Sequence, residues 1–383
     1  MGDPRDWQER LPGVVEVLAG NAGRHDREAS FPEDSIRAIH EAGLLTLTVA
    51  ERHGGPGAGL ADTVAVLRAL GQGDPSAGLV AAMTMFTHAM ESRQPTWPED
   101  VYAAVVRESA IRPVLINDLQ VEPELGTPVR GGLPATVAKR TDQGHEVTGH
   151  KIFSTGGEAL SWMVVWARDG DSDEARGFLV RGGAPGVTVR RTWDHLGLRA
   201  TRSDDVVFDG AAAVATGKIA PRGPLLNAWN ALGLSALYLG VAQAARDWLV
   251  SFLIDRRPAS LGAPLATLPR FRAAVGEIDV ALGTSWQLLS SLASRVDHGD
   301  EAAAGQAASA KLVATRAAIR AVEEAVGLVG NNALTRRNPL ERHLRDVLCG
   351  RVHTPQDDSI LSAMGRGAFA GRLAPPTGRD GPG

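Results

Sequence analysis

Hydrophobic residues recur at helical intervals along the first part of the chain. From Trp7 to about Glu108 they are spaced by three or four positions, as at Leu60, Val64 and Leu67, so that they share one face of a helix. We therefore predict an N-terminal helical domain over residues 1–112.

Two glycine-rich runs interrupt this helical pattern, at residues 53–59 and 71–76. A dinucleotide-binding loop follows a strand and opens a helix, and neither run has that setting. We interpret both runs as turns.

The residue pattern changes in the middle of the chain, where short runs of β-branched and aromatic residues are separated by glycines. The runs are residues 114–116, 146–148, 163–166, 177–180, 187–189 and 205–208. Repeated short strands of this kind predict a small antiparallel barrel or sandwich. A parallel sheet would need helical crossovers, which this stretch lacks. The central β domain is predicted over residues 113–222.

The helical period returns after Pro224 and continues nearly to the end. One long helix carries Leu237, Val241 and Trp248 on one face, and further helices are predicted near residues 271–296 and 312–329. Together they predict a C-terminal antiparallel four-helix bundle over residues 223–372, followed by a disordered tail at 373–383. Helices, then strands, then a bundle make the fold class α+β.

Composition narrows the class of protein. The chain has 383 residues, of which 44% are hydrophobic, and a formal net charge of -4, so it can bury a sizeable core and has no broad positive field for nucleic acid. Its single cysteine, Cys349, excludes an intramolecular disulfide framework, and we expect a cytoplasmic protein. The most apolar helical stretch carries Arg246 and Asp247 in its middle, so we predict no membrane span. We also predict no metal site.

The segment Arg345-Asp346 followed by residues 347–356 resembles the C-terminal flavin-site segment of the acyl-CoA dehydrogenase superfamily. Further motifs match in the family's order, so that the resemblance covers roughly residues 31–370. It implies the acyl-CoA dehydrogenase fold, a bound FAD, and a homotetramer or homodimer assembled through the C-terminal bundle.

The stretch from Gly149 to Gly157 resembles the family segment that borders the flavin ring, with Phe153, Ser154 and Thr155 at the ring. An aromatic face packs on the isoalloxazine, and a hydroxyl can donate a hydrogen bond to N5, which takes up hydride. The alternative is an ordinary strand that leads into a glycine turn.

Other flavin contacts are carried over from the resemblance. Gly126 and Thr127 stand in the loop that wraps the flavin, although this loop is about two residues longer than the family's, and residues 196–208 resemble the family's closing β signature. Arg256, Gly330 and Asn331 match the pyrophosphate-binding places, with Arg256 reaching the flavin of a neighbouring subunit. The alternative for Arg256 is a helix-terminal arginine that binds its own carbonyl groups. Gln356 and Asp358 complete the predicted flavin-binding residues.

The catalytic base is the point at which the chain departs from the family. The glutamate that removes the substrate's α-proton lies eight residues after the family's Arg-Asp pair, and Thr354 stands there. Some relatives carry that glutamate on the first long helix of the bundle, but Trp229 and Asn230 occupy this place. Either Asp357 or Asp358 folds back as the base, or His353 handles the proton, because an imidazole titrates at about 6.5.

Three functions follow from the resemblance. It favours an FAD-dependent dehydrogenase that desaturates an acyl-CoA or carrier-bound thioester by transferring hydride to flavin N5. The first alternative is a flavin-dependent monooxygenase using a C4a-hydroperoxyflavin, with FMN as a possible cofactor and with His353, Ser154 and His88 assisting. The second is a flavin-binding protein without dehydrogenase activity. The expected partners are an acyl thioester or another small-molecule substrate, and a flavin reductase or electron-transfer protein.

Overall fold

The computed structural model describes residues 6–125, 132–172, 174–217 and 223–369, and the statements below concern these residues. The predicted tail at 373–383 and the predicted flavin-loop residues Gly126 and Thr127 lie outside them.

Helices form the N-terminal part of the molecule, as the spacing of the hydrophobic residues predicts. They are α1 (Trp7–Glu28), α2 (Glu33–Glu41), α3 (Leu60–Gly73), α4 (Pro75–Arg93) and α5 (Glu99–Ser109), with the short 3-10 turns η1 (Leu44–Thr46) and η2 (Glu51–His53). The run at 71–76 contains the predicted turn, because Asp74 ends α3 and its carboxylate accepts the Ser76 amide to cap α4. The run at 53–59 is the connection from η2 to α3, where Gly54 and Gly57 take positive φ.

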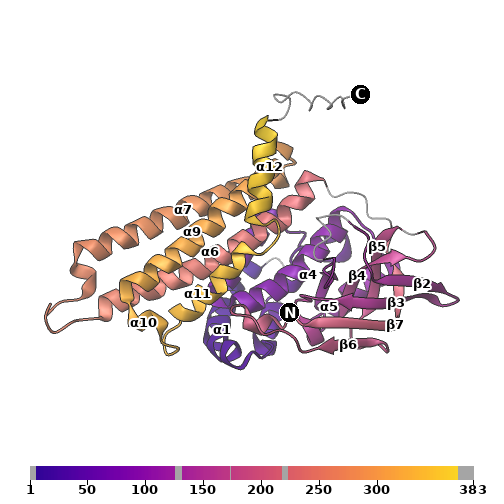
Figure 1. The fold of residues 1–383 in the computed structure, drawn as a ribbon, viewed down its shortest axis with the longest axis horizontal. Coiled ribbons are helices and arrows are strands. Elements are labelled where there is room, and N and C mark those ends of the chain that lie inside the picture. Colours follow the sequence, from indigo (N-terminus) through magenta and orange to yellow (C-terminus); the bar gives the residue numbers. More distant parts are fainter. Residues whose placement is uncertain (1–5, 126–131, 173, 218–222, 370–383) are drawn as a thin grey trace, which may run out of the picture.

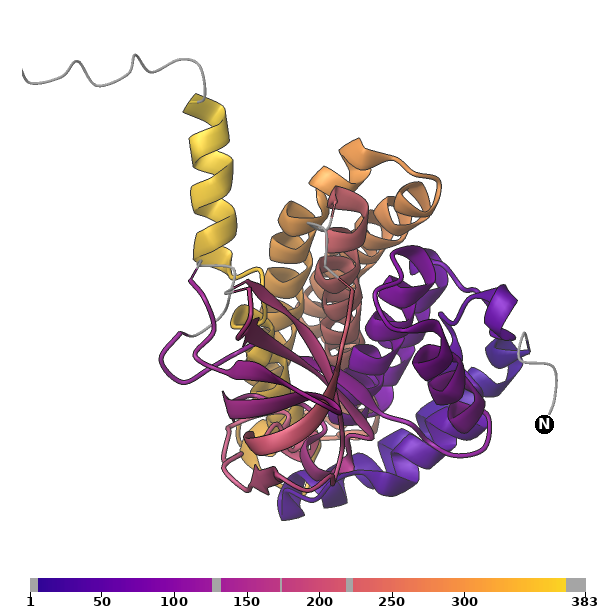
Figure 2. The ribbon, with the colours of Figure 1, turned by 90° about the vertical axis from the view of Figure 1, so that its right-hand side faces the viewer.

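Seven strands form the central part, which lies beside the N-terminal helices (Figures 1 and 2). The strands are β1 (Ile116–Leu119), β2 (Val137–Thr141), β3 (Gly144–Lys151), β4 (Trp162–Asp169), β5 (Ala175–Arg181), β6 (Val187–Arg190) and β7 (Asp205–Ala215), with 3-10 turns η4 (Gly157–Ala159) and η5 (Arg199–Thr201). Their pairing runs β4-β5-β7-β3-β2 and back to β4, which closes the sheet into a small barrel.

One edge of the barrel departs from the predicted antiparallel arrangement. Strand β1 pairs with β4 in parallel, with Ile116 opposite Trp162, and β2 also meets β4 in parallel over two residues. No helical crossover is needed, because β1 enters directly from α5 and the β2–β3 hairpin intervenes before β4. The remaining pairs are antiparallel.

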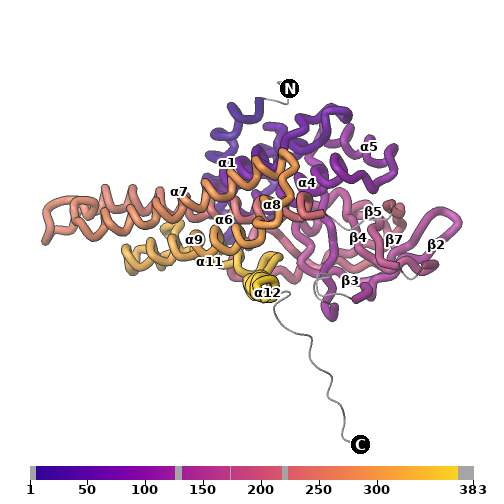
Figure 3. Tube along the Cα trace, turned by 90° about the horizontal axis from the view of Figure 1, so that it is seen from above, coloured from indigo at the N-terminus to yellow at the C-terminus, as the bar shows by residue number. Residues whose placement is uncertain are grey.

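The C-terminal part is a bundle of long helices, as predicted (Figures 1 and 3). Its elements are α6 (Pro224–Asp255), η6 (Leu265–Thr267), α7 (Pro269–Asp297), α8 (Glu301–Gly305), α9 (Ala307–Val329), α10 (Asn331–Leu334), α11 (Leu340–Leu348), η7 (Cys349–Arg351) and α12 (Asp357–Phe369). Helix α6 is the central one and packs on α3, α7, α9 and α11, whereas α12 projects from the body (Figures 1 and 2).

Helix α6 is long and apolar enough to cross a bilayer by length and composition. However, 78% of its most apolar 18-residue window is buried inside the protein, as is usual for the core helix of a bundle. Its buried Leu237, Tyr238 and Leu249 belong to the main hydrophobic core.

Candidate functional site

The loop after β3 presents an aromatic ring outward and two hydroxyl groups inward. Phe153 has a φ of 57° and is 52% exposed, whereas Ser154 and Thr155 are buried. A left-handed conformation is costly for a bulky residue, so the surrounding contacts must hold it. Those contacts are backbone hydrogen bonds from Ser154 to Asp204 and from Gly156 to Thr201.

Thr155 begins a chain of hydrogen bonds that reaches the Arg-Asp pair. Its hydroxyl oxygen lies 3.0 Å from that of Ser203, which lies 2.8 Å from that of Thr201. The Thr201 hydroxyl donates to the Leu198 carbonyl, and the Leu198 amide donates to Asp346 at 2.7 Å. The segments predicted to contact the ring and the Arg-Asp pair are thus connected through the turn at 196–203.

Arg345 and Asp346 join the three parts of the molecule. The Arg345 guanidinium binds the Asp26 carboxylate of α1 at 2.6 Å and 2.8 Å and donates to the Leu196 carbonyl. Burial raises the pKa of Asp346 to about 7, although the Leu198 amide and the Arg342 charge act in the opposite direction. The pair therefore positions the turn at 196–203 for the loop that carries Thr155.

A buried ion pair fixes the start of the predicted flavin loop to β3. The Lys151 ammonium lies 2.7 Å from Glu122, which also accepts the backbone amides of Ala135 and Thr136. Burial acts to raise the pKa of Glu122, but the bonds from Lys151 and Thr136 leave it below its ordinary value. The pair holds the two ends of the segment that contains Gly126 and Thr127.

An aromatic cluster beside Phe153 was not found from the sequence. The ring of Phe153 meets those of Trp193 and His195 edge-on, with centroids 6.4 Å and 6.0 Å away, and Trp193 and His195 stack on each other at 3.6 Å. The one signal in the sequence is that Trp193 and His195 are separated by a single residue just before the turn at 196–203. The edges of Trp193 and His195 hold the Phe153 ring from one side, and the ring itself is half exposed.

The segment predicted to hold the base lies against α6. Nδ1 of His353 lies 2.5 Å from the Tyr238 hydroxyl, and the Thr354 carbonyl accepts a hydrogen bond from Asn230 at 2.7 Å. Burial and the nearby Lys311 charge lower the pKa of His353 to about 4. His353 is therefore a neutral imidazole with one nitrogen already engaged, and Tyr238 is a site residue that the sequence did not reveal.

The two predicted aspartate bases have different contacts. The Asp357 carboxylate is bound by Lys311 at 3.4 Å and by Arg316 at 3.1 Å, both on α9. Asp358 is exposed at the start of α12 and accepts the Ser359 amide. Gln356 precedes them and is partly buried.

The second place considered for a base, at Trp229 and Asn230, holds no acid. Trp229 is 2% exposed, and the Arg93 guanidinium of α4 lies 4.3 Å from its ring centroid. Asn230 holds the Thr354 carbonyl, as described above. Both side chains shape and anchor the site without offering a carboxylate.

His88 belongs to a different neighbourhood. It is fully buried, its Nδ1 lies 3.1 Å from the Tyr102 hydroxyl of α5, and burial lowers its pKa to about 4. Its Nε2 and the Ser154 hydroxyl are buried without a hydrogen-bond partner in the described part of the chain. No described contact joins His88 to Ser154, so the predicted assistance of the two residues stays a prediction.

Arg256, Gly330 and Asn331 lie at the end of the bundle, opposite the strands (Figures 1 and 3). Gly330 has a φ of 58°, and the exposed Arg256 guanidinium has no partner among the residues that the structure describes. Arg256 therefore does not bind the carbonyl groups of its own helix. Within one chain, these residues do not meet Phe153 and Thr155.

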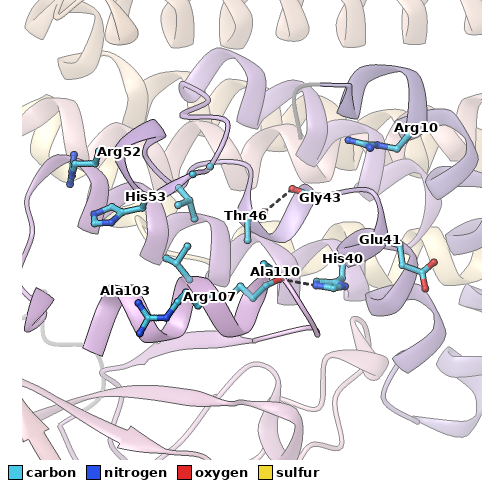
Figure 4. A pocket seen from close by; sticks show the side chains of 15 residues that line it. Arg10, His40, Glu41, Gly43, Thr46, Arg52, His53, Ala103, Arg107 and Ala110 are labelled. Atoms are coloured by element: carbon cyan, nitrogen blue, oxygen red, sulfur yellow. Dashed lines mark hydrogen bonds between the residues drawn. The ribbon is translucent and has the colours of Figure 1, made fainter. Parts of the chain in front are cut away.

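The residues around Phe153 fit a flavin ring. Phe153 provides an exposed aromatic ring that its neighbours hold edge-on, and Thr155 is a hydroxyl held in place by Ser203. The Asn117 side-chain amide donates to the Thr155 carbonyl at 3.0 Å and fixes the loop from behind. A cavity of about 560 Å³ lies elsewhere, in the N-terminal helical part, and belongs to another feature of the molecule (Figure 4).

Three family models match the chain in order: acyl-CoA dehydrogenase, N-terminal domain, over residues 14–92; middle domain, over residues 121–211; and C-terminal domain, over residues 232–357. The chain is 32% identical over 371 residues to "Putative acyl-CoA dehydrogenase YdbM" of Bacillus subtilis, covering 95% of this chain and 97% of that protein.

Two further similar proteins have names other than acyl-CoA dehydrogenase. "Amino sugar nitrososynthase DnmZ" of Streptomyces peucetius is 27% identical, with 90% of this chain and 88% of that protein covered. The solved structure of KijD3 with FMN and a dTDP-linked amino sugar has a TM-score of 0.81 at 26% identity, with 96% of this chain and 94% of that chain covered.

Proposed function

Because the chain belongs to the acyl-CoA dehydrogenase family, we propose that it is a flavin-dependent oxidoreductase that transfers oxygen to a small organic substrate, that is, a monooxygenase. The oxidoreductase class follows from the family. The monooxygenase activity is the proposal. The sequence alone favours desaturation and makes the monooxygenase the first alternative, and we here place the monooxygenase first.

One observation carries the proposal: the described segment that faces α6 offers no free carboxylate. Desaturation requires a base for the α-proton of a thioester, ordinarily a carboxylate beside the flavin. Residues 347–356 contain no acid, and Asp357 is bound by Lys311 and Arg316. His353 is a weak base, because its pKa of about 4 leaves its neutral form little tendency to accept a proton.

The chain's own residues have defined tasks in such a reaction. The bound flavin supplies the redox chemistry with oxygen. Phe153 and its aromatic neighbours would support the ring. The Thr155 hydroxyl, which donates to Ser203 in the chain of hydrogen bonds described above, would turn its proton to the place where charge develops on the reduced ring. His353 and Tyr238 present a neutral, hydrogen-bonded polar group that can orient a substrate without removing a carbon-bound proton.

Two similar proteins support the choice of a monooxygenase. One is named an amino sugar nitrososynthase, and the KijD3 structure contains FMN. The unpaired Arg256 and the positive φ of Gly330 support a pyrophosphate site supplied by a second subunit. We therefore propose FAD, a homodimeric or homotetrameric assembly and an external flavin reductase, with FMN as the alternative cofactor.

Thioester desaturation remains the second candidate function. It is supported by the 32% identity to a protein described as an acyl-CoA dehydrogenase over 95% of this chain. It would require a base from the substrate, from a partner subunit or from His353. A flavin-binding protein without either activity is the third candidate.

Anaerobic mixing of the flavin-loaded protein with saturated acyl-CoA thioesters of short, medium and long chain tests the choice. A monooxygenase leaves the flavin oxidised with every thioester. Bleaching of the flavin with formation of the enoyl product would establish desaturation and overturn the proposal.

A second measurement supplies a flavin reductase, NADH and ¹⁸O₂ with a panel of amines, thioethers and aromatic compounds. Incorporation of ¹⁸O into a product detected by mass spectrometry supports oxygen transfer. A Thr155→Val variant should lower this turnover by about 10² or more, because the hydroxyl beside the ring is lost, whereas Thr155→Ser should retain most of it. Absence of both reactions across both panels would favour the third candidate.

A further inference from the structure

A cavity of about 560 Å³ lies in the N-terminal helical part (Figure 4), and neither Thr155 nor any residue of the bundle lines it. Helix α5 forms one side of it, and the segment from the end of α2 through η2 forms the other, with Arg10 of α1 closing one end. Cavities of this size hold small organic molecules. Neither the family nor the proposed oxygen transfer assigns a role to it.

The charged residues that line the cavity are mostly basic. Arg10, Arg52 and Arg107 come from three separate elements, and Glu41 is the one carboxylate among the lining residues. The lining of the cavity is therefore positively charged, whereas the whole chain has a formal net charge of -4. Arg52 and Arg107 lie with His53 toward one end of the cavity, whereas Glu41 lies toward the other (Figure 4).

The guanidinium groups at that end are available to a ligand. Arg107 is exposed and has no hydrogen-bond or ion-pair partner in the part of the chain that the structure describes. Its neighbours Arg112 and Arg181, in contrast, are both paired with Glu108. Arg52 makes two long hydrogen bonds of 3.4 Å to the Ser92 carbonyl, which an anion can replace.

Glu99, which lies near His53, weakens this positive charge only slightly. Oε1 of Glu99 lies 3.9 Å from Nδ1 of His53, and the Glu99 side chain is 80% exposed. The charge of such an exposed carboxylate is largely screened by water. The end of the cavity with Arg52 and Arg107 therefore keeps an excess of positive charge.

The wall between these charges is apolar. Val49 and Val106 face the cavity from its two sides, together with Ala103 and Ala110 of α5. Such a surface favours an organic body over a bare inorganic ion.

We propose that this cavity binds a small phosphorylated organic molecule, with its phosphate held by Arg52 and Arg107 and its organic part against Val49 and Val106. The planar fork of arginine matches pairs of phosphate oxygens and stays charged at any working pH. The enclosure by two sides of the helical part selects a small molecule over a nucleic acid chain. The site is distinct from the flavin site, so its occupancy does not depend on the proposed reaction.

Calorimetric titration of the flavin-loaded full chain tests the proposal with three phosphorylated probes, namely AMP, glucose 6-phosphate and pyridoxal 5′-phosphate, and with inorganic phosphate and adenosine as controls. At least one phosphorylated probe should bind at least tenfold more tightly than inorganic phosphate, and adenosine should bind at least tenfold more weakly than AMP if AMP is the best probe. Arg107→Ala and Arg52→Ala should each weaken the best probe by tenfold or more and leave the flavin content unchanged.

Arg140→Ala is the matched control, because Arg140 is exposed on β2 in the central part of the molecule, and it should bind the probe as the natural chain does. The proposal is overturned if none of the organic phosphates binds or if Arg107→Ala binds the best probe unchanged. Loss of flavin in parallel with loss of the probe would also overturn it, because the probe would then occupy the flavin site.

Discussion

At the scale of single residues, the two tyrosines of the chain have the same type of partner in two different places. Tyr238 is bonded to His353 at the candidate site, and Tyr102 is bonded to His88 in the N-terminal helical part. Burial lowers the pKa of both histidines to about 4. The two pairs therefore differ in position more than in chemistry, and they form a matched comparison.

Tyr238→Phe should lower turnover of an oxygenated substrate by about tenfold, because His353 loses the bond that orients it. Tyr102→Phe removes a similar hydroxyl from His88 and should leave turnover within about twofold. Steady-state kcat and KM of both variants, with circular dichroism as a check of folding, provide the comparison. Equal losses in the two variants would show that the hydroxyl of Tyr238 acts through stability alone.

Asp346 predicts a specific dependence of stability on pH. Its pKa rises from the ordinary 3.8 to about 7 in the folded protein, so the folded chain binds a proton that the unfolded chain releases between these pH values. This carboxyl therefore lowers the free energy of unfolding as pH rises from about 4 to about 7, by at most about 4 kcal/mol.

The measurement is urea unfolding of the natural chain and of Asp346→Asn across that range. The buried His88 and His353 act in the opposite sense, because their lowered pKa values stabilise the folded chain above about 6.5 and this contribution is lost as pH falls toward 4. The difference between the two chains removes the histidine contribution. It should shift in favour of Asp346→Asn with rising pH, and a constant difference would contradict the raised pKa of Asp346.

At the scale of elements, the contact between α3 and α6 depends on glycine. A Cβ on Gly71 would lie 2.1 Å from the Leu237 carbonyl oxygen, and one on Gly240 would lie 2.0 Å from that of Arg68. The two helices thus approach each other backbone to backbone, which joins the N-terminal helices to the central helix of the bundle. The sequence run at 71–76 was interpreted only as a turn, but Gly71 has this packing role within α3.

Gly71→Ala should reduce the free energy of unfolding by about 1–3 kcal/mol, because the backbone of α6 cannot move away without disturbing the core. Gly276→Ala on α7 is the control, since its Cβ would meet nothing within 4 Å, and it should stabilise by about 0.5–1 kcal/mol. Denaturant unfolding monitored by circular dichroism measures both. Stabilisation by both substitutions would show that the α3–α6 contact adjusts freely.

At the scale of the whole molecule, two groups of the predicted flavin-binding residues lie apart from each other within one chain. Phe153 and Thr155 belong to the strands, and Arg256 and Gly330 belong to the far end of the bundle (Figure 3). A dinucleotide cofactor that contacts both groups needs two copies of the chain. Oligomerisation and FAD binding are therefore coupled in our proposal.

Arg256→Ala should weaken FAD binding by tenfold or more and leave FMN binding nearly unchanged, because only FAD carries the pyrophosphate. Arg320→Ala, which removes an exposed arginine of α9, is the control and should bind both flavins normally. Flavin fluorescence titrations measure the affinities, and light scattering measures the mass of the assembly. A monomer that binds FAD with unchanged affinity in Arg256→Ala would overturn the coupling.

The sequence by itself determined the α+β class, the order of helices, strands and bundle, and the family. These depend on local periodicity and on motifs that are contiguous in the chain, as in the Phe153 to Thr155 loop and the Arg345-Asp346 pair. The same locality allowed the prediction, from the residues alone, that Thr354 and Trp229 stand at the places of the usual base.

Only the tertiary structure decided what each of these residues contacts. The hydrogen-bond chain from Thr155 to Asp346, the bond of His353 to Tyr238 and the parallel β1–β4 pair all join segments distant in sequence. Burial and long-range pairing set the pKa values and the free or occupied state of each carboxylate, and neither is encoded in the spacing of neighbouring residues.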